Sequence, residues 1–298
     1  MAVRNDHGFS LLEALIAVAV LLLLFSAAMP ALNQTMMFNR TVGDLSEMHG
    51  SVRGATELMQ QEIGQAGRVA LPGPISLAAN APKGTSTVAL TTTTGLFVGV
   101  QIVVGAGEQA ETVAVTAMAS PSVTATFTID HAAGEPIHVY GGFVTGIIPP
   151  GMANGSTGTV LKLYGDINDD GSMVYVEYTC NLANKKVYRN VMAWDAASKP
   201  AVTEAMALLN NVIPNPNNAA CFTYQTQTVL ANTFVTGVAV TLSVESQQVD
   251  LYSKVKSQAT KTLLNVSPRN IFLVWTMASI GIQNRLQPTP ASIIALLP

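Results

Sequence analysis

Residues 1–30 read MAVRNDHGFSLLEALIAVAVLLLLFSAAMP, and this stretch decides how the rest of the chain is organised. Its apolar run, from Phe9 to Met29, is about as long as the roughly 20 residues with which a helix crosses a bilayer core. Glu13 lies near the start of the run, where a carboxylate costs about 2.5–3.5 kcal/mol of insertion free energy. The surrounding Leu, Ile, Val and Phe side chains each return about 0.3–0.6 kcal/mol, so the segment still inserts. An acid kept at such a cost predicts a functional role and a charged partner.

The polar leader MAVRNDHG precedes the apolar run, whereas a secretory signal peptide is cut after its apolar region, at a small-x-small motif. A leader that ends in Gly8, with Phe9 next and Glu13 at the fifth position after the cut, resembles the class III signal of type IV prepilins. The resemblance implies that a membrane peptidase cuts between Gly8 and Phe9, that Phe9 is then methylated, and that the apolar segment is retained. The resemblance also implies that Glu13 pairs with the amino group freed at Phe9, in the same or a neighbouring subunit. The alternative is a plain N-terminal membrane anchor with a stray acid.

Many pilins have a helix-kinking proline at the position of Pro30. After it, the apolar residues lie on one side of the predicted helix. They recur at steps of three and four, which draws a stripe along one helical face: Val42, Leu45, Met48, Val52, Ala55, Met59, Ile63 and Ala66. The helix should end near Gly67, before LPGP. Its length would be on the order of 85 Å, so the first half must contact lipid or other subunits while the second half supports a globular head.

The composition is that of an exported protein with a bridged pair of cysteines. Charged residues make up 11% of the chain, below the roughly 25% of soluble domains. The net charge of −3 provides no basic patch, so nucleic acid is not an expected partner. Beyond a bacterial inner membrane, the pair Cys180 and Cys221 is expected to form a disulfide; the alternative is two unpaired buried thiols.

Residues 85–140 contain short β-branched runs separated by turns, which predicts a small β module inserted into the head. The stretch is similar to small β modules that recur in bacterial surface proteins. His131, Glu135 and His138 lie at its end and suggest a metal site, but a turn followed by a strand explains them better.

The segment TVLKLYGDINDDGSMVYVEYTCN contains the acidic turn, residues 166–171. Asp166, Asn168 and Asp170 occupy positions 1, 3 and 5 of a calcium loop, Gly171 is at position 6 and Glu177 at position 12. The flanking residues alternate like strands, so Glu177 would lie on a rigid strand and not reach the ion. Calcium is therefore one interpretation, and a simple hairpin turn is the other. PilW-like proteins often carry such a turn, and calcium sites occur among pseudopilins.

The resemblance extends to RGATELMQQEIGQAGR and to residues 160–270, which are similar to PilW-like minor pilins. It implies an α+β fold with a long N-terminal helix on a β-rich head. The apolar tail IFLVWTMASIGI is too short for a second span and is expected to form a buried strand, a short helix or an exposed contact surface. The predicted parts are a leader (1–8), a membrane half (9–29) and an amphipathic half (30–68) of the helix, a linker (69–84), the β module (85–140) and a pilin-type head (141–298).

No sequence motif of a known catalytic site is present, so an enzyme is not expected, and apart from calcium at the acidic turn no cofactor is expected. The resemblance implies a structural subunit at or near the tip of a type IV pilus that helps to prime assembly. Its partners would be prepilin peptidase, other minor pilins and the major pilin. It would lie in the inner membrane, with its head in the periplasm, before it joins the filament. The alternatives are a J-type pseudopilin of type II secretion and a membrane-tethered adhesin that does not polymerise.

Overall fold

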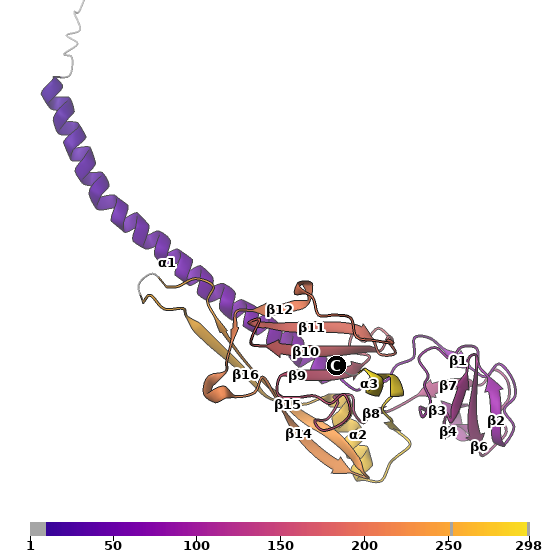
Figure 1. Cartoon of the computed structure of the whole chain (residues 1–298). Coiled ribbons are helices and arrows are strands. Elements are labelled where there is room, and N and C mark those ends of the chain that lie inside the picture. The colour runs from indigo at the N-terminus through magenta and orange to yellow at the C-terminus, as the bar shows by residue number, and fades with distance from the viewer. Residues whose placement is uncertain (1–9, 251–252, 297–298) are drawn as a thin grey trace, which may run out of the picture. The chain divides into compact units, whose positions relative to one another are not determined.

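The computed structural model of the chain describes residues 10–250 and 253–296 (Figure 1). These residues form two compact units. The first unit runs to Gly50 and includes Ser246–Ser257. The second unit comprises Ser51–Glu245 and the chain from Gln258 onward. The fold class is α+β, as predicted, with one long helix and a head made of several antiparallel sheets.

Helix α1 runs from Leu11 to Gln65 and spans 55 residues, close to the predicted extent. It includes Pro30 without an assigned break. The helix ends because Gly67 adopts a φ of +81°, a left-handed conformation that glycine accepts at a helix C-terminus. The Gly67 amide then donates to the carbonyl of Tyr164 at 2.9 Å, which joins the helix end to the first strand of the head sheet.

The predicted apolar stripe of α1 is buried along most of its length. Six of its members are buried: Met48, Val52, Ala55, Met59, Ile63 and Ala66. Val42, by contrast, is 48% exposed, so burial of the stripe starts later than expected. Val42 lies in the part of α1 that precedes Met48, where the side chains are exposed or only half-buried.

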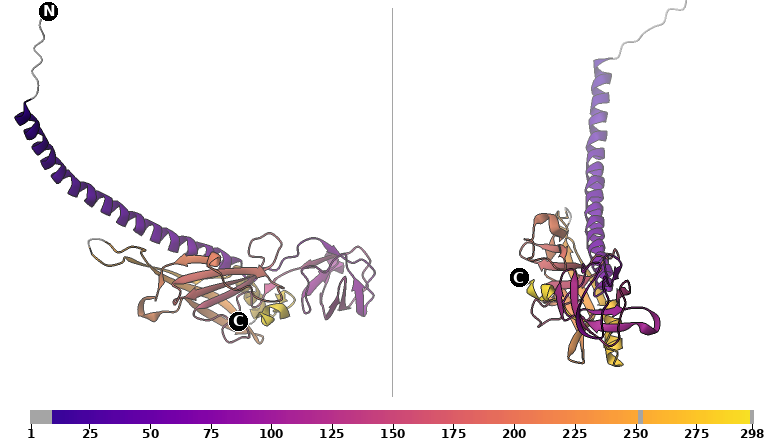
Figure 2. Two further views of the ribbon diagram at one scale, coloured as in Figure 1. Left: turned by 45° about the horizontal axis from the view of Figure 1, so that its top comes forward. Right: turned by 90° about the vertical axis from the view of Figure 1, so that its right-hand side faces the viewer.

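The small β module consists of two antiparallel sheets, in the orders β1-β7-β3-β4 and β2-β6-β5. Its strands are gathered in one lobe (Figure 2). They are β1 (Ile75–Ser76), β2 (Gly84–Ala89), β3 (Gln101–Val104), β4 (Glu111–Ala114), β5 (Ala117–Ala119), β6 (Ser122–Phe127) and β7 (Pro136–Val139), with a 3-10 turn at Gly107–Gln109. The strands begin at Ile75, inside the segment expected to be a linker, because Ile75 pairs with Ile137 of β7.

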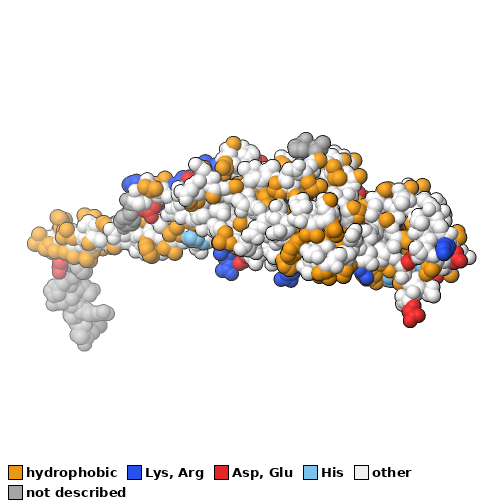
Figure 3. All heavy atoms as spheres, turned by 90° about the horizontal axis from the view of Figure 1, so that it is seen from below, with side chains coloured by type: hydrophobic (Ala, Val, Ile, Leu, Met, Phe, Trp, Pro, Cys, Tyr) orange, Lys and Arg blue, Asp and Glu red, His pale blue; other side chains and the backbone are white. Residues whose placement is uncertain are grey.

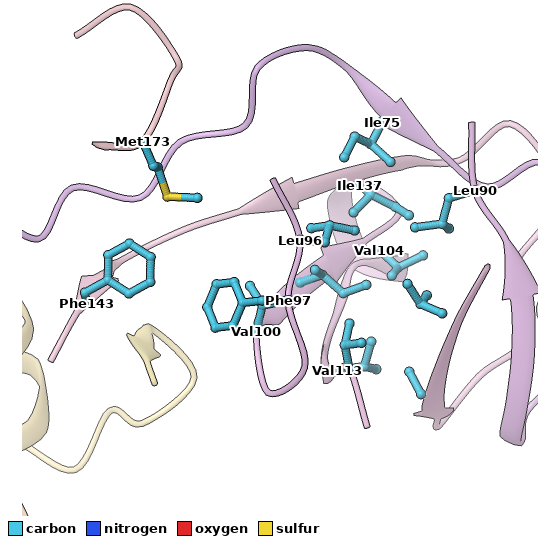
Figure 4. Close-up of a cluster of buried hydrophobic side chains, with 14 of the residues drawn as sticks. Ile75, Leu90, Leu96, Phe97, Val100, Val104, Val113, Ile137, Phe143 and Met173 are labelled. Atoms are coloured by element: carbon cyan, nitrogen blue, oxygen red, sulfur yellow. The ribbon is translucent and has the colours of Figure 1, made fainter. Parts of the chain in front are cut away.

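The core of the module continues into the head (Figure 4). Ile75, Val104 and Ile137 are buried in its centre. The ring of Phe97 contacts the ring of Phe143 at a centroid distance of 5.8 Å, and Phe143 lies in the head segment. The module is therefore anchored by shared apolar burial as well as by its chain connections.

The head contains two further sheets and a short parallel pair. The first sheet has the order β12-β11-β10-β9, and the second is built around the long strand β15, with β13 and β14 along one edge and β16 along the other. The bounds are β8 (Gly142–Phe143), β9 (Val160–Gly165), β10 (Val174–Asn181), β11 (Lys186–Ala193), β12 (Ala207–Asn210), β13 (Val212–Ile213), β14 (Phe222–Val229), β15 (Asn232–Glu245), β16 (Gln258–Val266) and β17 (Leu286–Gln287), with 3-10 turns at Glu204–Met206 and Pro216–Asn218.

The apolar tail forms helix α2 (Arg269–Ser279), and α3 (Ala291–Ala295) follows near the C-terminus. The tail is therefore a short helix, one of the predicted forms. Ile271, Val274 and Ala278 are buried on its inner face, while Phe272 and Leu273 are exposed on its outer face.

Candidate functional site

The first candidate site is the N-terminal end of α1. Gly8 and Phe9, the predicted cleavage pair, lie outside the described residues. The description begins at Ser10, whose hydroxyl accepts a hydrogen bond from the Glu13 amide at 3.2 Å. The Ser10 amide in turn donates to a carboxylate oxygen of Glu13 at 3.5 Å. This reciprocal pair is a capping box, and the Ser-x-x-Glu spacing of Ser10 and Glu13 is its sequence signature.

The apolar half of α1 has no protein cover. Its best window of 18 residues has a mean hydropathy of 2.6 and none of it is buried, so this helix is long and apolar enough to cross a membrane. Leu11, Leu22 and Leu24 are each more than 60% exposed. Hydrophobic side chains cover this end of the helix (Figure 3). Such a surface needs lipid or other apolar helices around it.

The other half of α1 is attached to the head sheet by a buried ionic cluster. Glu62 is only 4% exposed, and its carboxylate accepts hydrogen bonds from the Tyr178 hydroxyl of β10 and the Arg189 guanidinium of β11. Burial, followed by the charge of Glu62, raises the pKa of the Tyr178 hydroxyl, which therefore stays a proton donor. No local sequence pattern predicts this pairing, because Glu62 and Arg189 are 127 positions apart.

Cys180 and Cys221 form a disulfide, as predicted, with their Cα atoms 6.5 Å apart. Cys180 lies in β10, and Cys221 directly precedes β14. The bond therefore links the two main sheets of the head. Both cysteines are buried, so the bond belongs to the interior.

The acidic turn joins β9 to β10, so its flanks are strands as expected. Asp166 is 1% exposed and accepts the Asp170 amide at 3.1 Å, while Asp170 accepts the Ser172 amide at 2.8 Å. These bonds are those of a turn stabilised by its own side chains. Arg68 places its guanidinium 3.5 Å from the second carboxylate oxygen of Asp166 and also pairs with Asp169. A calcium ion would have to compete with this resident positive charge.

The remaining predicted calcium ligands are arranged less favourably. Asn168 is exposed, and Glu177 lies on β10, where its carboxylate binds Lys199 at 2.7 Å. Within residues 10–250 and 253–296, no group of three or more His, Cys, Asp or Glu side chains is arranged to hold a metal. Calcium at Asp166, Asn168 and Asp170 stays a prediction.

His131 is part of a buried cluster that sequence reasoning found only in part. Its side chain is fully buried, with Nδ1 at 2.6 Å from Glu135 and Nε2 at 2.8 Å from Glu111. Burial alone would lower the pKa of His131, but the hydrogen bonds and charges of Glu135 and Glu111 outweigh it and raise the pKa above its ordinary value. Ionised carboxylates only accept hydrogen bonds, so both ring nitrogens of His131 must donate. Only the protonated imidazole has two N–H groups to do so. His138 lies apart on β7 with its ring against Tyr140, so the turn followed by a strand describes this region.

The His131 cluster connects the two sheets of the small module. Glu111 begins β4 of one sheet, and its carboxylate accepts the amide of Thr128, just beyond β6 of the other sheet, at 2.9 Å. The backbone of His131 pairs with Ala81 through two hydrogen bonds of 2.9 Å. The cluster therefore has a structural role inside the module.

Comparison with known proteins identifies one part of the chain. Residues 3–29 match the family model of the prokaryotic N-terminal methylation motif. The matched range contains Gly8, Phe9 and Glu13. No curated protein and no solved structure matches the chain.

Proposed function

We propose that this chain, whose residues 3–29 match the methylation motif and support a type IV pilin-like prepilin with a class III signal, is a minor type IV pilin of the PilW-like kind. In this role it joins the filament at or near the tip and helps to prime assembly. The observation that carries the proposal is the division of α1. Its N-terminal part bears the methylation motif and has no protein cover, whereas from Ser51 onward the helix belongs to the β-rich unit and buries its apolar stripe there.

An uncovered apolar helix half is useful to a subunit that changes its surroundings. Before assembly, lipid surrounds residues such as Leu22, and in a filament the corresponding halves of other subunits replace the lipid. Glu13 then pairs with the amino group that cleavage frees at Phe9 of an adjacent subunit. Partial desolvation inside the helix bundle makes this charge pair selective for the correct stagger of subunits.

The proposed partners and location follow from the same half of α1. Prepilin peptidase cuts after Gly8 on the cytoplasmic face, and other minor pilins and the major pilin pack against the apolar half. The single helix anchors the protein in the inner membrane, with the head in the periplasm. The disulfide between Cys180 and Cys221 agrees with this oxidising compartment. The role is structural rather than enzymatic, with no cofactor required for assembly.

The small β module supports a minor rather than a major subunit. It adds residues 75–139 to the head without contributing a strand to the sheet β12-β11-β10-β9. An abundant subunit repeats every feature along the whole filament, whereas a subunit present in few copies tolerates such a bulky addition. The added module then presents a surface that the rest of the filament lacks.

The experiment compares the full-length protein in strains with and without prepilin peptidase. In the competent strain, the mature protein should begin at Phe9 by mass spectrometry and occur in sheared filaments, with labelling concentrated at filament ends. A Gly8→Val variant should keep Met1 and stay in the membrane fraction. Processed protein found only in membranes would favour the tethered adhesin, and loss of secretion with normal pili would favour the J-type pseudopilin.

A further inference from the structure

A second buried polar cluster lies in the head, between β9, β10 and the loop before β9. Its centre is Lys162, which is only 5% exposed although lysine is among the residues least often buried. The Lys162 amine donates to the side-chain carbonyl oxygen of Asn154 at 2.9 Å. Among the described residues, no carboxylate lies within ion-pair distance of this amine, although buried ammonium groups are normally paired.

Asn154 is held in a fixed orientation. It is 5% exposed, and its Nδ2 group donates to the carbonyl of Ile293 at 2.8 Å and to the Tyr175 hydroxyl at 3.4 Å. Its Oδ1 atom accepts Lys162 and also Lys199, whose ammonium lies at 3.3 Å. The amide carbonyl is therefore polarised by two amines, while its nitrogen faces a hydroxyl.

Glu177 completes the cluster from β10. It accepts the Tyr175 hydroxyl at 2.9 Å and the Lys199 ammonium at 2.7 Å. Lys199 thus has its own carboxylate, and Lys162 does not. Burial, followed by the charge of Lys199, lowers the pKa of Lys162, with the charge of Glu177 acting in the opposite direction. A larger fraction of Lys162 is consequently an uncharged, nucleophilic amine.

We propose that Lys162 and Asn154 form an intramolecular amide bond between their side chains. The Lys162 Nζ atom attacks Cγ of Asn154, a new C–N bond forms, and the bond from Cγ to Nδ2 breaks. Negative charge collects on Oδ1, where the Lys199 ammonium already donates. One proton passes from the attacking nitrogen to Nδ2, which leaves as ammonia.

The proton relay is present in the cluster. The Tyr175 hydroxyl contacts Nδ2 of Asn154 and is hydrogen-bonded to Glu177, so it lies between a base and the leaving group. No oxidant, metal or second substrate is needed, because an amine and an amide give a substituted amide and ammonia. The bond would tie the loop before β9 to β9 itself and fix Asn154 against the C-terminal segment at Ile293.

A competing reaction is suppressed by the same geometry. Asn154 precedes Gly155, and in such pairs the following backbone nitrogen can attack the side-chain amide, which also releases ammonia. Here the Gly155 amide donates to the carbonyl of Met152 at 2.9 Å, which keeps that nitrogen engaged. The side-chain amine of Lys162 is then the nucleophile that faces Asn154.

Mass spectrometry of the purified, folded, full-length protein tests the proposal. The intact mass should be lower than the sequence mass by one ammonia, after allowance for N-terminal processing and the disulfide. After reduction, trypsin should fail to cut at Lys162, so residues 84–162 and 163–185 appear as one peptide that lacks one ammonia. Fragmentation should place the link between Asn154 and Lys162.

Matched variants separate the amide bond from other events. Lys162→Arg and Asn154→Ala should both restore the full mass, whereas Lys185→Arg, which alters an exposed lysine paired with Glu245, should not. Loss of ammonia that persists in Lys162→Arg would indicate cyclisation at Gly155 and overturn the proposal. The proposal would also be overturned if trypsin cut completely after Lys162, with Asn154 intact, in wild-type protein that was purified folded and then unfolded for digestion. This outcome does not depend on whether the variants fold.

Discussion

Replacing Glu62 with alanine should strongly destabilise the head. The change removes the carboxylate that joins α1 to both β10 and β11, and leaves the Arg189 guanidinium and the Tyr178 hydroxyl without their acceptor. Removal of one partner of a buried ion pair commonly costs about 3–5 kcal/mol. Glu62 is 4% exposed, which favours the upper part of that range, but the Arg189 side chain is 27% exposed and regains water, which favours the lower part. We expect a loss of about 3–4 kcal/mol in the free energy of unfolding.

Denaturant unfolding of the full-length protein in detergent, with the disulfide intact, measures this loss. Glu57→Ala is the matched control, because Glu57 lies on the same helix and pairs with Arg53 at 2.7 Å, but both side chains are more than half exposed. An exposed pair of this kind contributes little, so the control should unfold close to the wild type. Equal unfolding midpoints for Glu62→Ala and Glu57→Ala would refute the reasoning. A double variant with Arg189→Ala should lose less than the sum of the two single variants, because the partners are coupled.

Four further outcomes are expected. Glu13→Leu should be cleaved and inserted normally but poorly crosslinked to partner pilins, and normal incorporation would contradict an assembly contact. Alanine at both Cys180 and Cys221 should lower the free energy of unfolding by about 4 kcal/mol, since the bond closes a loop of 41 residues; an unchanged denaturant midpoint would contradict this. If calcium binds at the acidic turn, it should raise the melting temperature and Asp170→Ala should abolish the rise, whereas equal melting temperatures with calcium and with chelator leave only a hairpin turn. The pKa of His131 is raised above its ordinary value, so its contribution to stability is complete below the unfolded pKa of about 6.5 and is lost as pH rises through the folded pKa; the melting temperature should fall across that rise, and His131→Gln should flatten the trend.

The parts of the structure that depend on local pattern were predictable. The length of α1, its change from an all-round apolar surface to a stripe, and its end at Gly67 each follow from neighbouring residues. The acidic turn and its flanking strands were predictable for the same reason. The disulfide followed from the count of two cysteines and the expected compartment.

The parts that depend on distant pairing were not predictable from one sequence. From the sequence, Glu62 is one of several polar residues on a helix. Only the fold, which places Arg189 of β11 beside it, shows that it is buried and paired. The Glu111 partner of His131 and the Ile75 strand that starts the small module likewise require a strand register that spans many residues. Lys162 reads as the polar member of an alternating strand, and only the folded loop brings Asn154 to it.

Two acids on one helix illustrate two different ways to satisfy a charge. Glu62 receives its partners from its own chain, so its loss should affect folding whether or not other subunits are present. Among the described residues, Glu13 receives the backbone amide of Ser10, which is the second residue after the predicted cut. The capping box therefore satisfies the carboxylate within the isolated chain, while cleavage creates a stronger, cationic donor at Phe9. If Glu13 exchanges the first partner for the second on assembly, its substitution should leave the unfolding of the head unchanged and reduce incorporation. Glu62→Ala should destabilise the head but leave incorporation unchanged under conditions where the head is still folded. Identical defects in both variants would show that the two halves of α1 do not have separate roles.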